Sequence, residues 1–134
     1  MSESNDLNKG SERTPPRERF AADALQFDLL AEAAKLEGED GGSHSGHRQV
    51  TLYKHEQATV ALFRFERNGS LPKHKAPGTV FIQVLEGNIE FDVEGSVKTV
   101  AAGGLLALAP GARHDVRALE PSVMLLTVCL QKRD

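Results

Sequence analysis

The sequence predicts an all-β fold, an antiparallel barrel or two-sheet jelly roll with one short N-terminal helix. After residue 48 the chain breaks into short segments rich in β-branched and aromatic residues, separated by turn dipeptides such as Asn-Gly and Gly-Gly. In Ile89–Val93 apolar and acidic residues alternate, which places the apolar side chains on one face. About eight such strands cannot cover one core as a flat sheet, so closure is expected. The expected strands are residues 50–54, 59–65, 79–85, 89–93, 97–100, 105–108, 115–119 and 123–130.

The chain divides into three regions. Residues 1–20 are polar and charged, with little apolar surface to bury, so a disordered arm is expected; contact with a partner or a neighbouring subunit is the alternative. Residues 21–47 are expected to hold a short helix, from Asp28 to Glu37, and a Gly/Ser-rich loop. The barrel domain is expected over residues 48–134. The helix is predicted because three apolar residues share one helical face: Leu29, Ala33 and Leu36.

Composition excludes several classes of partner. A chain of 134 residues makes one domain, and its net charge of -3 gives no global electrostatic reason to bind nucleic acid or an anionic membrane. No apolar run reaches the roughly 18 residues of a membrane helix. The one cysteine, Cys129, excludes an intrachain disulfide and is expected to be a buried, inert thiol in an apolar strand. A cytoplasmic protein without nucleic-acid or membrane partners is therefore expected.

The segment from Asn68 to Ala118 resembles the two signature motifs of the cupin superfamily. The first motif usually reads Gly, five residues, His-x-His, three or four residues, Glu, six residues, Gly. Here Gly87, in Val-Leu-Glu-Gly, stands at the closing glycine. Counting back from Gly87 along the motif places Val80 at the glutamate position, Ala76 at the position of the second histidine and His74 at that of the first.

The second motif usually reads Gly, five residues, Pro-x-Gly, two residues, His, three residues, Asn. Gly103 and His114 match it in register, Pro110 is displaced by one position, and Ala118 stands at the asparagine. The amino-acid sequence around these motifs is similar to that of small single-domain bacterial cupins, most of unassigned function. The resemblance covers roughly residues 48–130 and implies a cupin β-barrel.

In metal-binding cupins three histidines and the glutamate hold one divalent metal, for which the resemblance implies Zn, Ni, Fe or Mn. This chain keeps His74 and His114 and has Ala76 and Val80 at the other two positions. Two protein ligands are fewer than the three usual in catalytic zinc or iron sites, and no carboxylate remains to neutralise the ion. An incomplete metal site and a metal-free pocket both stay open.

Apolar residues at the lost ligand positions predict a roomier pocket that suits an organic ligand. The expected pocket residues are Ala76, Val80 and Ile82. Gln83 is a further candidate metal ligand on the same strand. It lies three residues from Val80, so a regular strand points it to the opposite face, and only a bulge would reverse this.

Other polar candidates are less specific. His55 is expected in a solvated turn, and His47 in the Gly/Ser loop. Arg64, and Arg113 beside His114, are candidates for binding an anionic substrate at the barrel mouth, although most surface arginines are simply solvated.

Three functions are considered on this basis. The first is a small-molecule-binding cupin, with or without a weakly held metal. The second is a cupin metalloenzyme of dioxygenase, isomerase or decarboxylase type. The third is a non-catalytic oligomerisation module. The resemblance implies a homodimer, since cupin barrels commonly dimerise through sheet edges, and here the exposed terminal strands and the N-terminal arm could form the contact. The complete barrel motifs and the depleted ligand set favour the first.

Overall fold

The computed structural model describes residues 23–37 and 46–130, apart from the side chain of His74. The expected arm at residues 1–20 and most of the Gly/Ser-rich loop lie outside these ranges. The described elements are α2 (Leu29–Glu37), β1 (His47–His55), β2 (Ala58–Phe65), β3 (Ser70–His74), β4 (Thr79–Glu86), β5 (Asn88–Val93), β6 (Ser96–Ala101), β7 (Leu105–Leu108), β8 (His114–Ala118) and β9 (Ser122–Cys129).

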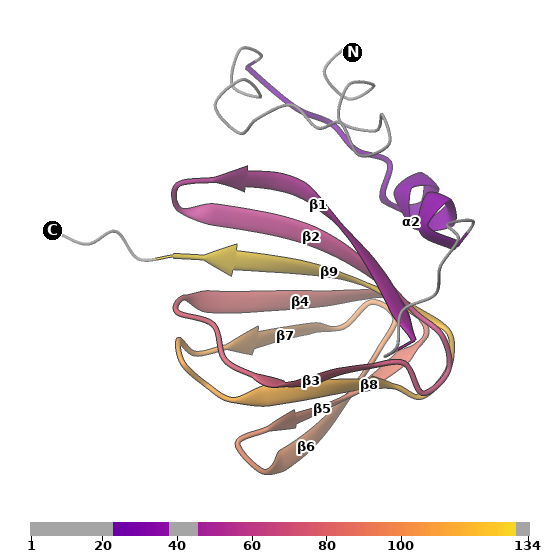
Figure 1. The fold of residues 1–134 in the computed structure, drawn as a ribbon, viewed down its shortest axis with the longest axis vertical. Helices are drawn as coiled ribbons and strands as arrows, with labels where there is room; N and C mark the ends of the chain where they lie inside the picture. Colours follow the sequence, from indigo (N-terminus) through magenta and orange to yellow (C-terminus); the bar gives the residue numbers. More distant parts are fainter. Residues whose placement is uncertain (1–22, 38–45, 131–134) are drawn as a thin grey trace, which may run out of the picture.

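The strands form two antiparallel sheets that face each other (Figure 1). One sheet has the order β1-β2-β9-β4-β7 and the other the order β3-β8-β5-β6. The predicted all-β jelly roll with one short N-terminal helix is therefore confirmed. No helix in the described ranges is long and apolar enough to cross a membrane.

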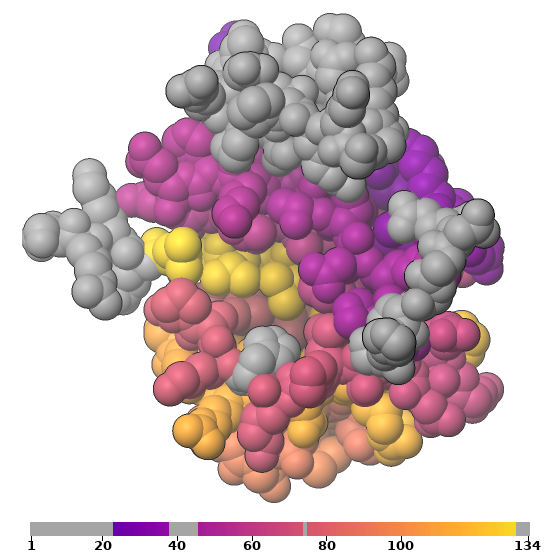
Figure 2. Space-filling model, viewed as in Figure 1, coloured from indigo at the N-terminus to yellow at the C-terminus, as the bar shows by residue number. Residues whose placement is uncertain are grey.

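The core lies between the two sheets and follows from alternation along the strands. In β4, Val80, Ile82 and Val84 are buried, whereas Phe81 and Gln83 are exposed on the outer face. The space-filling view shows side chains closing the space between the two ribbons (Figure 2). Burial of each large apolar side chain stabilises the fold by about 1.5–3 kcal/mol, so the inward-facing side chains of the strands hold the two sheets together. The buried core residues are Ala61, Phe63, Phe65, Val80, Ile82, Val84, Ile89, Phe91, Leu108, Val116, Ala118 and Met124.

The predicted helix is confirmed, with Asp28 as its N-cap. The Oδ1 atom of Asp28 accepts a hydrogen bond from the Ala31 amide at 3.1 Å, satisfying one of the donors left open at a helix start. Ala33 and Leu36 are buried. They pack in a second apolar cluster with residues from β1, β2 and β9: Val50, Leu52, Leu62 and Val123. The helix therefore covers part of the outer face of the five-stranded sheet.

Two local expectations were wrong. Strand β3 was not predicted, because Pro72 and Lys73 interrupt its apolar pattern. Proline is tolerated there because β3 is an edge strand, paired only with β8 in its sheet. Cys129 is exposed rather than buried, since it is the last residue of β9 and lies beyond the closely packed part of that strand.

Gly87 closes the link between the two sheets, from β4 to β5, and no other residue fits there. Its φ is 87°, in the left-handed region that favours glycine. An added Cβ would also overlap the Ser122 hydroxyl. That hydroxyl is buried and cannot move away easily, because it donates to the Glu120 carbonyl at 2.7 Å and accepts from the Asn88 amide at 3.1 Å.

We expect Gly87→Ala to destabilise the protein much more than Gly95→Ala. Both glycines have a φ of 87°, so both alanines incur the same left-handed strain, about 1–2 kcal/mol. Gly95 has nothing within 4 Å of the added Cβ, whereas Gly87 adds a steric overlap that costs about a further 1–3 kcal/mol. Urea unfolding of both variants measures the difference, and equal losses of stability would contradict this account.

Candidate functional site

The two motif histidines lie directly opposite each other on neighbouring strands. His74 of β3 is the register partner of His114 of β8. The pairing depends on a one-residue register shift in β3 between Leu71 and His74. Without it, the register that joins Leu71 to Val116 would place His74 opposite Arg113 instead. The shift therefore brings together two positions that lie forty residues apart in the sequence.

The His114 ring is buried inside the barrel. Only 2% of the residue is exposed, and it lies on the same face of β8 as the buried residues Val116 and Ala118. Its Nδ1 lies 3.1 Å from the Ala112 carbonyl oxygen. A carbonyl oxygen only accepts, so Nδ1 donates this hydrogen bond, and whenever the ring is neutral its lone pair is on Nε2. A backbone bond of this kind fixes the ring orientation and the tautomer.

A pocket of about 500 Å³ lies at the same end of the barrel. Its walls come from the loop after β3 and the loop before β8, and a hydrogen bond of 2.9 Å from the Gly111 amide to the Ala76 carbonyl joins these loops. The lining residues are Lys75, Ala76, Pro77, Pro110 and Gly111. We call this the mouth pocket. Its walls are mostly apolar, and Lys75 supplies a positive charge at the rim.

The residues predicted to line a pocket or bind a metal on and before β4 lie in three different environments. Ala76 lines the mouth pocket and packs against the core. Val80 and Ile82 are 2% and 0% exposed and belong to the closed core rather than to the lining of the pocket. Gln83 is exposed on the outer face of β4, where the regular alternation places it, away from His114.

The remaining polar candidates lie apart from the mouth pocket. His55 is the last residue of β1 and is half-buried, not fully solvated. His47 is not in a loop but begins β1, and its ring packs against Phe63 and Phe65. Arg64 lies on β2 and contacts Ala33 and Glu37 of α2, whereas Arg113 lies just before β8.

The described residues do not fit a catalytic metal centre. No group of three or more His, Cys, Asp or Glu side chains among them could hold a metal ion. In the barrel core, the position of the family glutamate is filled by Val80, and that of the second histidine by Ala76 at the core's edge. A dication there would lose its hydration without an anionic ligand to neutralise it.

A comparison with protein-family models matches residues 61–129 to the cupin domain. The match covers just over half of the chain and includes both histidine positions. The chain belongs to the cupin family. A comparison with curated proteins found no match.

Solved structures support the cupin fold. A conserved protein of unknown function from Streptococcus pyogenes, SPY1581, has a TM-score of 0.68 at 22% identity, covering 82% of this chain and 90% of that one. An RmlC-like cupin from Desulfovibrio desulfuricans has a TM-score of 0.60 at 25% identity, covering 69% and 90%. A cupin 2 conserved barrel domain protein from Leptotrichia buccalis has a TM-score of 0.61 at 26% identity, covering 66% and 43%.

Sequence reasoning found the histidines of this cupin but missed most of the pocket wall. Lys75, Pro77, Pro110 and Gly111 were not predicted to line a pocket. Their positions beside the two histidines, in Pro- and Gly-containing loops, were the available signal, because loops at the end of a barrel commonly form its binding site.

We expect the purified, tag-free cupin to hold no transition metal tightly. Chelation with EDTA should leave the thermal unfolding midpoint unchanged, because apolar packing and not metal ligation holds the barrel. Elemental mass spectrometry and thermal unfolding test this for wild type, His74→Ala and His114→Ala, with His55→Ala as a histidine control outside the core. Near-stoichiometric metal that is lost in both motif variants but kept in His55→Ala would contradict the expectation.

Proposed function

We propose that this cupin binds a small organic molecule in the mouth pocket. The observation that supports the proposal is a mostly apolar pocket of about 500 Å³ formed by the two loops that flank the paired histidine positions. Ligand sites in proteins typically combine apolar walls with a few fixed polar groups. Here Lys75 is the charged group of the lining, and the buried imidazole of His114 lies outside the lining at the start of β8.

The chemistry of the pocket favours a ligand with an apolar body and a polar or acidic group. Two proline rings and the Ala76 methyl group offer flat apolar contacts, and the Lys75 ammonium group favours a negative charge. The hydrogen bond between Gly111 and Ala76 holds the loops in place, which lowers the ordering entropy that binding would otherwise cost.

Binding in this pocket does not require a metal. His74 and His114 are the residues that would hold a weakly bound divalent ion, and the described side chains form no group of three donors that could hold one. The metalloenzyme alternative gains no support from the described donor set, so ligand binding is the function we propose.

We expect Ala76→Leu to abolish ligand binding without unfolding the barrel. The larger side chain fills the pocket, whereas Ala102→Leu makes the same change in an exposed turn at the other end of the molecule. A ligand at one hundred times its Kd stabilises the fold by about 2.7 kcal/mol, which a thermal-shift screen detects readily. The screen should use sugars, organic acids and phenols.

A compound that stabilises wild type and Ala102→Leu but not Ala76→Leu supports the mouth pocket. If no compound in the panel stabilises wild type, or if Ala76→Leu keeps the full shift, the proposal is wrong.

We also propose that two copies of the chain associate through the outer face of β4 and β7. Leu105 of β7 is 64% exposed and Phe81 of β4 is 38% exposed. They lie on paired strands, since Leu105 is the register partner of Gln83 and Ala107 that of Phe81. Helix α2 packs on the β1, β2 and β9 side of this sheet, and in Figure 1 it lies away from β7.

We expect Leu105→Glu to convert a dimer into a monomer, because a charge would be buried in an apolar interface. Val97→Glu is the matched control, since Val97 is 60% exposed on the edge strand β6 of the other sheet. Light scattering over a range of concentrations gives the mass. A strictly monomeric wild type, or an equal effect of both substitutions, would refute this interface.

A further inference from the structure

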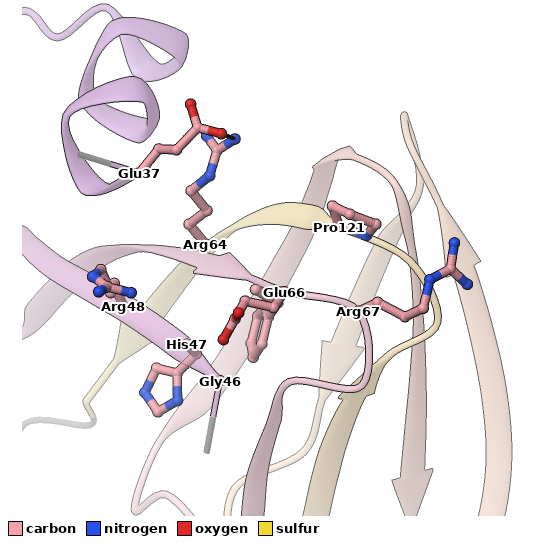
Figure 3. Close-up of a pocket in the computed structure, with 9 residues that line it drawn as sticks. Glu37, Gly46, His47, Arg48, Arg64, Glu66, Arg67 and Pro121 are labelled. Carbon is pink, nitrogen blue, oxygen red and sulfur yellow. Dashed lines mark hydrogen bonds and ion pairs between the residues drawn. The ribbon is translucent and has the colours of Figure 1, made fainter. Parts of the chain in front are cut away.

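A second pocket of about 500 Å³ lies at the end of the barrel opposite the mouth (Figure 3). It is formed where the C-terminal end of α2 approaches the start of β1 and the end of β2. We call it the α2-end pocket. Three arginines and two glutamates line it, in a protein whose overall net charge is -3. The arginines are Arg48, Arg64 and Arg67, and the glutamates are Glu37 and Glu66.

Two of these arginines form a like-charged pair across neighbouring strands. Arg48 of β1 is the direct register partner of Arg64 of β2, and both are half-buried. Opposite positions on an antiparallel pair have Cβ atoms about 4.5–5.5 Å apart, and like charges there destabilise the sheet. The repulsion is relieved when an anion lies between the two guanidinium groups.

The arginine pair is only partly neutralised within the protein. The Nη2 atom of Arg64 lies 3.0 Å from the Glu37 carboxylate, and its Nη1 donates to the Ala33 carbonyl at 3.1 Å. The Glu37 side chain is 70% exposed, so it is easily displaced. Within the described ranges Arg48 has no hydrogen bond or ion pair of its side chain. Figure 3 shows Arg64 reaching toward Glu37 while Arg48 lies apart from both.

The same pocket offers apolar surface for the rest of a ligand. Pro121 lines it and is exposed, whereas Phe65, which also lines it, is only 2% exposed and belongs to the barrel core. The His47 ring lies against the Phe63 and Phe65 rings, with centroids 5.9 and 5.8 Å away. The two phenylalanine rings face the barrel core, on the opposite side of the sheet from Arg64, which contacts α2. The exposed apolar surface of this pocket therefore comes from Pro121.

We infer that the α2-end pocket binds a small organic oxyanion, a molecule with a phosphate or carboxylate group on an apolar body. Arg48 and Arg64 hold the oxyanion in place of the Glu37 carboxylate, and Pro121 contacts the body. This site is separate from the mouth pocket and does not depend on it.

The test is a titration of the full-length protein with phenyl phosphate, followed by two-dimensional NMR. Benzoate distinguishes a carboxylate from a phosphate group, and inorganic phosphate measures what the apolar body adds. Amide shifts should concentrate at residues 46–48, 64–67 and at Ser122, which follows Pro121, and binding should weaken as salt is added.

Arg48→Ala should weaken phenyl phosphate binding about ten- to a hundredfold, the effect of losing one charge-assisted hydrogen bond. Lys98→Ala removes the same charge from an exposed site on β6 and should leave the Kd unchanged. Arg48→Lys keeps the charge, so it should lose less affinity for phenyl phosphate than Arg48→Ala. It also shows whether the loss in Arg48→Ala comes from a folding defect.

Glu37→Gln should have the opposite effect and strengthen binding, because it removes the internal competitor for Arg64. Glu90→Gln is its matched control: Glu90 pairs with Arg117 at 3.3 Å on the other sheet, and Arg117 has this glutamate rather than an arginine opposite it. Equal effects of Arg48→Ala and Lys98→Ala, or of Glu37→Gln and Glu90→Gln, would overturn the proposal. Absence of binding, or amide shifts confined to Lys75, Ala76 and Gly111 in the mouth pocket, would overturn it as well.

Discussion

The structure depends on one constraint, the burial of apolar side chains between two sheets that face each other. The inward rows of β4, β5 and β8 meet there: Val80, Ile82, Val84, Ile89, Phe91, Val116 and Ala118. Because alternate residues of a strand face opposite sides, this packing fixes what the outer faces carry. Gly87 belongs to the same constraint, since the chain crosses between the sheets there without room for a side chain.

A closed apolar core leaves little room for chemistry at its centre, so polar groups gather at its two ends. At one end His114 is buried beside the mouth pocket, with its tautomer set by the Ala112 carbonyl. At the other end the arginine pair lies between the sheet and α2. Helix α2 has two effects, because it covers apolar residues of the outer face and its last residue, Glu37, neutralises Arg64.

Much of the fold could be predicted from the sequence, because alternation and turn residues report directly on strands. The burial of Ile89 and Phe91 and the exposure of Gln83 follow from period two alone. Strand β3 could not be predicted, since a proline in an edge strand has no apolar pattern to reveal it. The pocket walls were missed for a related reason. They are loop residues, brought together by a hydrogen bond between Gly111 and Ala76 that no periodicity encodes.

Both candidate sites rest on register shifts, and this is why spacing alone could not define them. In the β1–β2 pair, Tyr53 lies opposite Val60, and continuing that register would place Arg48 opposite Phe65. A shift of one residue between Thr51 and Tyr53 moves Arg64 into that position instead. The shift between Leu71 and His74 acts in the same way on the histidine positions. Bulges disrupt a ladder and are retained where they reposition side chains, so both shifts fit a functional role.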